Sequence, residues 1–209
     1  QSKPAQPTTA GPLISVDVVP SETGLAIRFN WRREVGAAVF RRQRTTWVVF
    51  DKPGRLDLGG IRVAGRRVID QAEQAPANGL TALALRGMSV VPLGMRRDGT
   101  IWILDLARTA ETPAKRKADP LRVESDSQGV SRLVISGRSL RGPYTLQDPE
   151  IGDMIAVAST TEPGEGATGP RQYVDVEVFA SIQGIGLRPN SETVEVRAER
   201  DSIVVSSRP

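Results

Sequence analysis

Residues 24–51 read GLAIRFNWRREVGAAVFRRQRTTWVVFD, and this stretch decides the fold because the chain repeats it. A copy moved 55 positions along the sequence, without a gap, meets seven identical residues. The identical pairs are Gly24 and Gly79, Leu25 and Leu80, Val35 and Val90, Arg41 and Arg96, Arg42 and Arg97, Thr45 and Thr100, and Trp47 and Trp102. The apolar pattern recurs with them, since Phe40 falls on Met95 and Val49 on Leu104. We interpret the two stretches as a duplicated unit.

The unit has the signature of β-strands. Residues 14–19 and 25–31 alternate apolar and polar side chains, which is the two-residue period of a half-buried strand. Residues 37–42 resume this pattern, and residues 45–51 are rich in aromatic and β-branched types. Each unit of roughly 50 residues therefore accommodates four strands, and the Asp98-Gly99 pair predicts a tight hairpin in the second copy.

The remainder of the chain continues in the same style. Further strands are expected at 121–124, 132–136, 144–146, 154–158, 173–180, 185–188, 193–198 and 202–206. A helical turn is expected only at 68–75, because no long segment has a 3.6-residue period. The sequence predicts an all-β protein of antiparallel β-sandwiches built from these four-stranded units, with a small four-bladed β-propeller as the alternative.

Changes in composition along the chain suggest four regions. Residues 1–13 form a flexible leader rich in Pro, Ala and Thr, and residues 14–110 contain the duplicated β-domain. Residues 111–120 are polar and charged and form a linker or long loop. Residues 121–209 form a second β-domain or a continuation of the same repeat.

Composition removes several classes of chemistry. The 209 residues include no histidine and no cysteine, which excludes Ser-His-Asp triads, Cys-His dyads and zinc sites with nitrogen or sulfur ligands. We expect no cofactor, no metal and no catalytic residue. The net charge of +4 is unevenly distributed: residues 1–141 carry 23 Lys and Arg against 13 Asp and Glu, whereas residues 142–209 carry 5 against 11. A basic first part favours anionic partners.

No apolar run approaches the roughly 18 residues of a membrane helix, so no membrane insertion is expected. The leader QSKPAQPTTAGP is typical of a mature exported protein whose signal peptide was removed before Gln1. An arbitrary boundary inside a longer chain would produce the same start.

Residues 16–54, VDVVPSETGLAIRFNWRREVGAAVFRRQRTTWVVFDKPG, resemble the AMIN domain found at the amino end of periplasmic amidases and pilus secretins. The shared pattern is a V-x-V strand, a polar turn, an amphipathic strand, a charged link, and a last strand of three apolar residues and an aspartate. Val48, Val49, Phe50 and Asp51 match that last strand, and residues 102–105 match it more loosely. The chain is also similar to amino-terminal regions of large exported tetratricopeptide-repeat proteins of alphaproteobacteria.

This resemblance implies a periplasmic β-sandwich without catalysis of its own. Such a module attaches a larger protein to peptidoglycan or to an envelope machine such as a pilus, a secretion system or a flagellar motor. The oligomeric state stays open.

The candidate ligand-binding residues are the repeated arginine pairs and the tryptophans near them. Peptidoglycan offers sugar faces that stack on aromatic rings and carboxylates that an arginine fork holds by two charge-assisted bonds. Trp47 lies in an apolar strand and is expected in the core, whereas Trp31, beside two arginines, is expected to be exposed. The full set is Trp31, Arg32, Arg33, Arg41, Arg42, Arg44, Arg96, Arg97 and Trp102.

Two other functions compete with this one. Asp51 and Asp105 end corresponding strands, and a convergent pair of carboxylates would support a glycan-processing enzyme. The basic first part would also suit nucleic acid, although no recognition motif accompanies it and no nucleic acid is expected as a partner. The acidic residues Asp148, Glu150 and Asp153 lack the spacing of a calcium loop.

Overall fold

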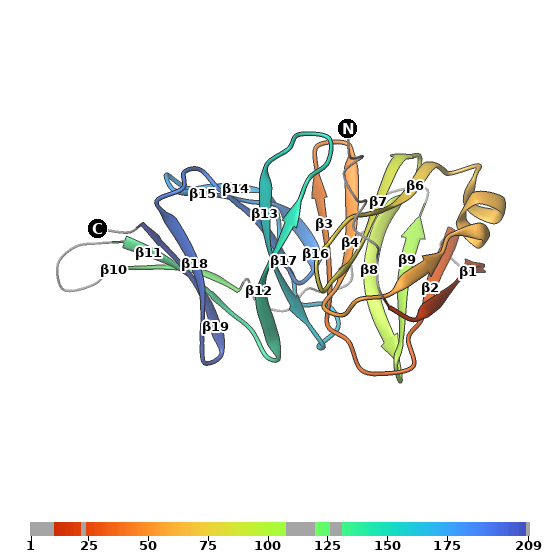
Figure 1. Ribbon diagram of the computed structural model, residues 1–209, viewed down its shortest axis with the longest axis horizontal. Coiled ribbons are helices and arrows are strands. Elements are labelled where there is room, and N and C mark those ends of the chain that lie inside the picture. Colours follow the sequence, from red (N-terminus) through yellow and green to blue (C-terminus); the bar gives the residue numbers. More distant parts are fainter. Residues whose placement is uncertain (1–10, 22–23, 108–119, 126–130, 208–209) are drawn as a thin grey trace, which may run out of the picture.

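The computed structural model describes residues 11–21, 24–107, 120–125 and 131–207, and these residues fold into three sheets (Figure 1). The leader predicted at 1–13 and the linker predicted at 111–120 lie largely outside the described residues.

The first sheet has five strands. In spatial order they are β5 (Arg55–Asp57), β1 (Leu13–Ser21), β2 (Gly24–Asn30), β9 (Ile101–Ala107) and β8 (Val91–Asp98). All neighbours are antiparallel except β5, which runs parallel to β1.

The second sheet has ten strands and runs through the middle of the molecule. Its main order is β14 (Arg171–Gln172), β15 (Val176–Val178), β17 (Ile185–Pro189), β13 (Met154–Thr160), β3 (Ala37–Arg42), β4 (Thr45–Phe50), β7 (Thr81–Met88) and β6 (Ile69–Ala75). In addition, β12 (Leu140–Gln147) pairs with β13 and β16 (Ala180–Gln183) pairs with β3. Strands β13 and β3 meet at a single residue pair, Thr160 and Ala37.

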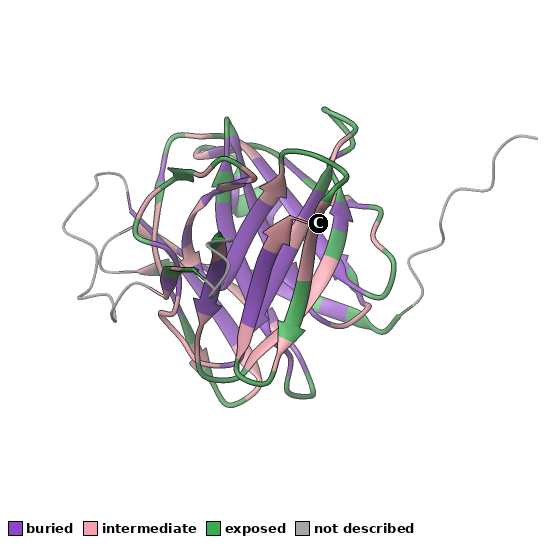
Figure 2. Cartoon of the chain, turned by 90° about the vertical axis from the view of Figure 1, so that its left-hand side faces the viewer, coloured by how far each residue is buried: buried purple, intermediate pink, exposed green. Residues whose placement is uncertain are grey.

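The third sheet has four strands. Their order is β10 (Leu121–Ser125), β11 (Ser131–Ser136), β19 (Ser202–Ser207) and β18 (Val194–Glu199). Viewed from this end of the molecule, buried segments run through the central strands and exposed ones mark the edges and turns (Figure 2).

Three apolar cores lie around these sheets. The first lies between the five-stranded sheet and one face of β3, β4, β6 and β7, and includes Phe29, Phe50 and Trp102. The second covers the opposite face of β3, β4 and β7, where Trp47 packs with residues of β12 and β13 and with Phe179. The third joins the four-stranded sheet to β13, β15 and β17 through aliphatic side chains. The predicted all-β, sandwich-like fold is confirmed.

The two copies of the duplicated unit exchange hairpins. The first sheet contains the order β1-β2-β9-β8 and the second contains β6-β7-β4-β3, so each sheet combines the first hairpin of one copy with the second hairpin of the other. This sharing of strands differs from a propeller, in which each unit would form its own four-stranded blade.

The two tryptophans aligned at a spacing of 55 are nevertheless not equivalent in space. Trp47 belongs to the second core and Trp102 to the first. Side chains alternate along a strand, so an alignment that is wrong by one residue exchanges the two faces. A spacing one residue shorter puts Val48 with Trp102 and Phe50 with Leu104, all four in the first core.

The helical turn predicted at 68–75 is wrong, because Ile69–Ala75 is strand β6, paired along its length with β7. Its Ala, Glu and Gln residues favour helix locally, but pairing with a buried neighbour overrides that weak preference. The helical turn lies just before it, at η1 (Ile61–Gly65), and is the single helical segment of the described residues. No helix in the described part of the chain has the length and apolar character to cross a membrane.

Candidate functional site

The predicted binding residues separate into two clusters at opposite ends of the duplicated sandwich (Figure 1). Arg41, Arg42 and Arg44 lie at the turn between β3 and β4. The remaining residues gather where the β2–β3 loop meets the β8–β9 turn: Trp31, Arg32, Arg33, Arg96, Arg97 and Trp102. The Thr100 hydroxyl donates to the carbonyl of Trp31 at 2.5 Å and ties this loop to this turn. A single ligand-binding surface formed by all nine residues is therefore not present.

Neither predicted tryptophan is available for stacking. Trp31 is only 2% exposed, contrary to the prediction that it is exposed, and its ring packs against Phe50. Trp102 is completely buried, and its Nε1 donates to the carbonyl of Val35 at 3.0 Å. The first core needs large side chains to fill the space between two sheets, and both rings serve that purpose. The idea of an aromatic platform for sugars is wrong at these positions.

Arg42 is a structural residue. It is 7% exposed and binds Asp153 through both terminal nitrogens and Asp148 through one, at 2.5–2.7 Å, while its guanidinium lies 5.5 Å from the centre of the Phe179 ring. Burial lowers the pKa of this guanidinium, but the two carboxylates outweigh that effect and raise it above its ordinary value. The bond joins the β3–β4 hairpin to the loop between β12 and β13.

Arg96 and Arg97 are also engaged. Arg96 forms an exposed ion pair with Asp105 at 2.8 Å. Arg97 lies 3.6 Å from Glu34 and 5.9 Å from the centre of the Trp102 ring, within reach of a cation–π contact. Their charges are therefore partly neutralised by the protein itself.

Four of the predicted arginines stay exposed and have no carboxylate partner among the described residues: Arg32, Arg33, Arg41 and Arg44. Arg41 only donates from Nε to the carbonyl of Gln43 at 3.3 Å, which leaves its outer nitrogens for a ligand. These are the predicted residues that the structure presents to solvent as charged groups.

Two hollows flank the β3–β4 turn. One, of about 480 Å³, is lined by Arg41, Arg42 and Arg188 together with Asp153, Glu177 and Phe179. The other, of about 420 Å³, is lined by Arg44 and Arg86 with Asp70 and Glu150. The first has one more positive than negative side chain among these residues, and Arg188 and Arg42 already hold its two carboxylates. Arg41 is the cation left over for an external anion.

The carboxylate pair proposed for catalysis does not act together. Asp51 directly follows β4 of the ten-stranded sheet, whereas Asp105 lies inside β9 of the five-stranded sheet, so the prediction that both residues end their strands is wrong for Asp105. Asp51 is buried and accepts hydrogen bonds from the backbone of Gly36 at 2.8 Å and from Arg141 at 3.2 Å. Asp105 is held by Arg96. Each carboxylate thus has its own arginine partner.

The acidic residues of the β12–β13 loop are engaged too. Asp148 and Asp153 bind Arg42, and Glu150 lies 3.3 Å from Arg86. Among the residues placed by the structure, no group of three or more Asp and Glu side chains is arranged to hold a metal ion.

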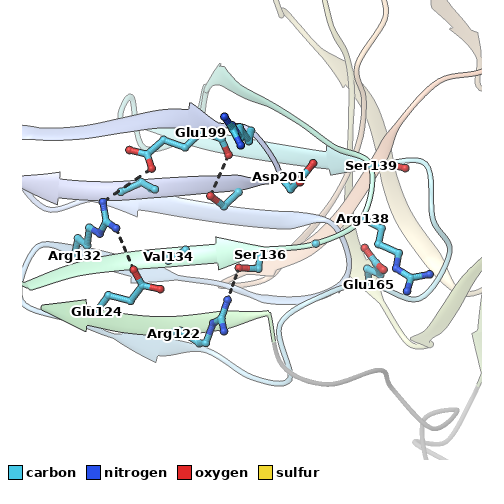
Figure 3. Close-up of a pocket in the computed structure, with 14 residues that line it drawn as sticks. Arg122, Glu124, Arg132, Val134, Ser136, Arg138, Ser139, Glu165, Glu199 and Asp201 are labelled. Atoms are coloured by element: carbon cyan, nitrogen blue, oxygen red, sulfur yellow. Dashed lines mark hydrogen bonds and ion pairs between the residues drawn. The ribbon is translucent and has the colours of Figure 1, made fainter. Parts of the chain in front are cut away.

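A hollow of about 1010 Å³, larger than the two beside the β3–β4 turn, lies on the outer face of the four-stranded sheet (Figure 3). Its floor contains Val134 and Val204, and its sides carry interlocked charges, such as Arg132 between Glu124 and Glu199. No binding motif in the sequence marks this surface. The available signal was the alternation of charged with apolar residues in residues 121–125 and 194–199, which indicates one solvent-facing side.

No family model matches the chain, and no curated protein matches it significantly.

Proposed function

We propose that this chain is a non-enzymatic binding and scaffold module of the bacterial periplasm, which attaches a larger protein to peptidoglycan or to an envelope machine. The proposal rests on the AMIN-like pattern of residues 16–54 and on the sandwich fold, which agrees with it. The periplasmic location is part of the proposal.

The observation that carries the ligand class is the pair of exposed arginines at the β3–β4 turn. Arg41 and Arg44 have no carboxylate partner among the described residues, and each borders one of the two hollows. A guanidinium binds a carboxylate by two parallel hydrogen bonds, and the peptide stems of peptidoglycan carry carboxylates. Phe179 adds an apolar wall to the larger of these two hollows. The expected ligand is a carboxylate-bearing glycopeptide.

Sedimentation with purified peptidoglycan sacculi tests the glycan version. We expect the intact protein to sediment with sacculi and the double variant Arg41→Ala/Arg44→Ala to stay in solution. The matched control is Arg32→Ala/Arg33→Ala, which removes two exposed charges at the opposite end of the sandwich. If the intact protein does not sediment, the glycan version is wrong, and in-cell crosslinking to an envelope protein would then support the assembly version.

The structure gives less support to the enzyme alternative. A general acid or base needs a proton that it exchanges with substrate, and Asp51 is buried with Arg141 and the Gly36 amide against it. Hydrolysis of muropeptides that disappears in Asp51→Asn, while the variant keeps its fold, would restore that alternative.

A further inference from the structure

A second basic surface lies away from all the residues considered above. Strand β5 and η1 connect the two copies of the unit, and η1 lies at the right-hand end of the long axis in Figure 1, opposite the four-stranded sheet. Within η1, Ile61 and Gly65 face the interior, while residues 62–64 face solvent, as do the following residues 66 and 67. We call residues 59–67 the basic turn.

The basic turn is firmly held in place. Ile61 is buried in the first core, and the backbone amide of Arg62 donates to the carbonyl of Leu58 at 3.0 Å. Gly60 passes so close to β1 that a Cβ atom there would lie 2.7 Å from the carbonyl oxygen of Val16. The side chains of the turn are therefore presented from a fixed backbone, which lowers the entropy lost when they bind.

The charge of the turn is strongly one-sided. Arg62, Arg66 and Arg67 are exposed, and none of them has a carboxylate partner within the described part of the chain. Two acidic residues flank the turn in sequence: Asp57, which accepts a hydrogen bond from the backbone amide of Gly59 at 3.1 Å, and Asp70, which is exposed at the start of β6. The turn itself thus carries three cations and no anion, with one carboxylate on either side of it in sequence.

The same turn also exposes an apolar side chain, which lies between Arg62 and Arg66 in the sequence. Val63 is 76% exposed, although it belongs to a residue type that is usually buried. A soluble polyanion would bind the arginines but would make no favourable contact with the valine. A bilayer with anionic headgroups makes favourable contacts with both, because the arginines contact phosphates while the valine reaches the boundary between headgroups and acyl chains.

We propose that the basic turn docks the protein on a membrane surface rich in anionic phospholipid. Docking involves Arg62, Arg66 and Arg67 with lipid phosphates and Val63 with the acyl boundary. The position of the turn at the end of the long axis lets it meet a flat surface without interference from the rest of the molecule (Figure 1). This surface is separate from the β3–β4 turn, so the proposal stands or falls independently of peptidoglycan binding.

Vesicle sedimentation with the full chain tests it. The probes are vesicles of phosphatidylcholine alone and vesicles of phosphatidylcholine with an equal amount of phosphatidylglycerol. Each arginine near an anionic bilayer strengthens binding about fivefold, so Arg62→Gln/Arg66→Gln/Arg67→Gln is expected to lower the partition coefficient on the order of 100-fold. The charge-matched control at the other end of the molecule, Arg122→Gln/Arg138→Gln/Arg197→Gln, is expected to lower it far less.

Val63→Ser separates a lipid surface from a plain polyanion. On the proposal it weakens binding to anionic vesicles by roughly threefold to tenfold and leaves binding to dextran sulfate unchanged. All altered side chains are exposed, and a thermal melt like that of the unaltered protein verifies the fold of each variant. Equal loss in the two triple variants, no effect of Val63→Ser, or binding to dextran sulfate without binding to vesicles would each overturn the proposal.

Discussion

The two sheets of the duplicated sandwich differ in what lies on their outer faces. Strands β3, β4 and β7 are covered on both sides, by the first core within the sandwich and by the second core outside it. Strands β1, β2, β8 and β9 are covered by a core on one side, and the other side carries exposed charge such as the Arg96–Asp105 pair. The duplicated unit therefore contributes strands both to a sheet that is covered on two faces and to a sheet that is covered on one face.

The residue pattern of the strands reflects this difference in coverage. Every residue of β4, TTWVVF, is buried, whereas β1 alternates between exposed and buried positions over its first five residues. A continuous apolar run is what a strand buried on both faces requires, and alternation is what a half-exposed strand requires. Two ion pairs show the same contrast: Arg42 is buried with Asp148 at the covered face, whereas the Arg96–Asp105 pair at the open face is solvent-exposed.

The largest effect is expected from the buried ion pair at the covered face. Arg42→Ala leaves Asp148 buried and Asp153 partly buried without their partner, and we expect the free energy of unfolding to fall by about 3 kcal/mol. The matched variant at the open face is Arg96→Ala, which breaks an exposed pair and is expected to cost less than about 1 kcal/mol. Urea denaturation measures both. Equal losses would mean that the two faces do not differ in this respect.

A glycine pair compares packing at the two faces. A Cβ at Gly186 would lie 2.5 Å from the ring of Phe40, so Gly186→Ala is expected to cost about 1–3 kcal/mol. Gly94 in β8 has nothing within 4 Å of such a Cβ, and Gly94→Ala is expected to change stability little. Thermal unfolding followed by circular dichroism distinguishes them, and a Gly186→Ala protein as stable as the unaltered one would contradict tight packing there.

The two repeated tryptophans offer a finer comparison. Trp102 donates a hydrogen bond to Val35, whereas the Trp47 Nε1 is buried without a partner among the described residues. Both Trp→Phe changes remove similar volume, but Trp102→Phe also leaves the Val35 carbonyl unpaired. We expect it to cost about 1 kcal/mol more than Trp47→Phe. The difference between two denaturation midpoints, with equal slopes, measures this; a reversed order would refute the assigned roles.

The smallest expected effect is on the pH dependence of stability. The hydrogen bond from Arg42 lowers the pKa of the Asp153 carboxyl, against the opposing effect of its partial burial. Because the folded pKa lies below the unfolded one, this bond contributes full stability above the unfolded value of about 3.9, and the contribution is lost as pH falls through the folded pKa. Unfolding free energies measured between neutral pH and pH about 3 should therefore fall less steeply for Arg42→Ala. Identical slopes would remove Asp153 from the explanation.

Much of the strand pattern could be predicted from local sequence. Alternation in residues 14–19 and 25–31 and the Asp98-Gly99 turn indicate strands β1 and β2 and the β8–β9 hairpin, because each depends on neighbours along the chain. Strand β6 could not be predicted in this way. Its residues favour helix by themselves, and only pairing with β7 makes them a strand.

The site was less predictable for a related reason. Whether an arginine is free or neutralised depends on residues far away in sequence, as with Arg42 and Asp153. The exposure of Trp31 depends on a second sheet that closes over it. The correct spacing of the repeat could not be predicted from the sequence either. Identities such as Trp47 and Trp102 favour a spacing of 55, whereas the cores require a spacing one residue shorter.

The exchange of hairpins between the copies has a consequence for the origin of the chain. Each sheet of the duplicated sandwich is completed by strands from the other copy, so a lone copy would have only two strands in each layer, with β2 and β4 lacking their partner strands β9 and β7. Such a copy would fold stably only when paired with a second copy. The duplicated region thus has the organisation of a hairpin-swapped homodimer contained in one polypeptide, with the segment that carries the basic turn as the connection between the two copies.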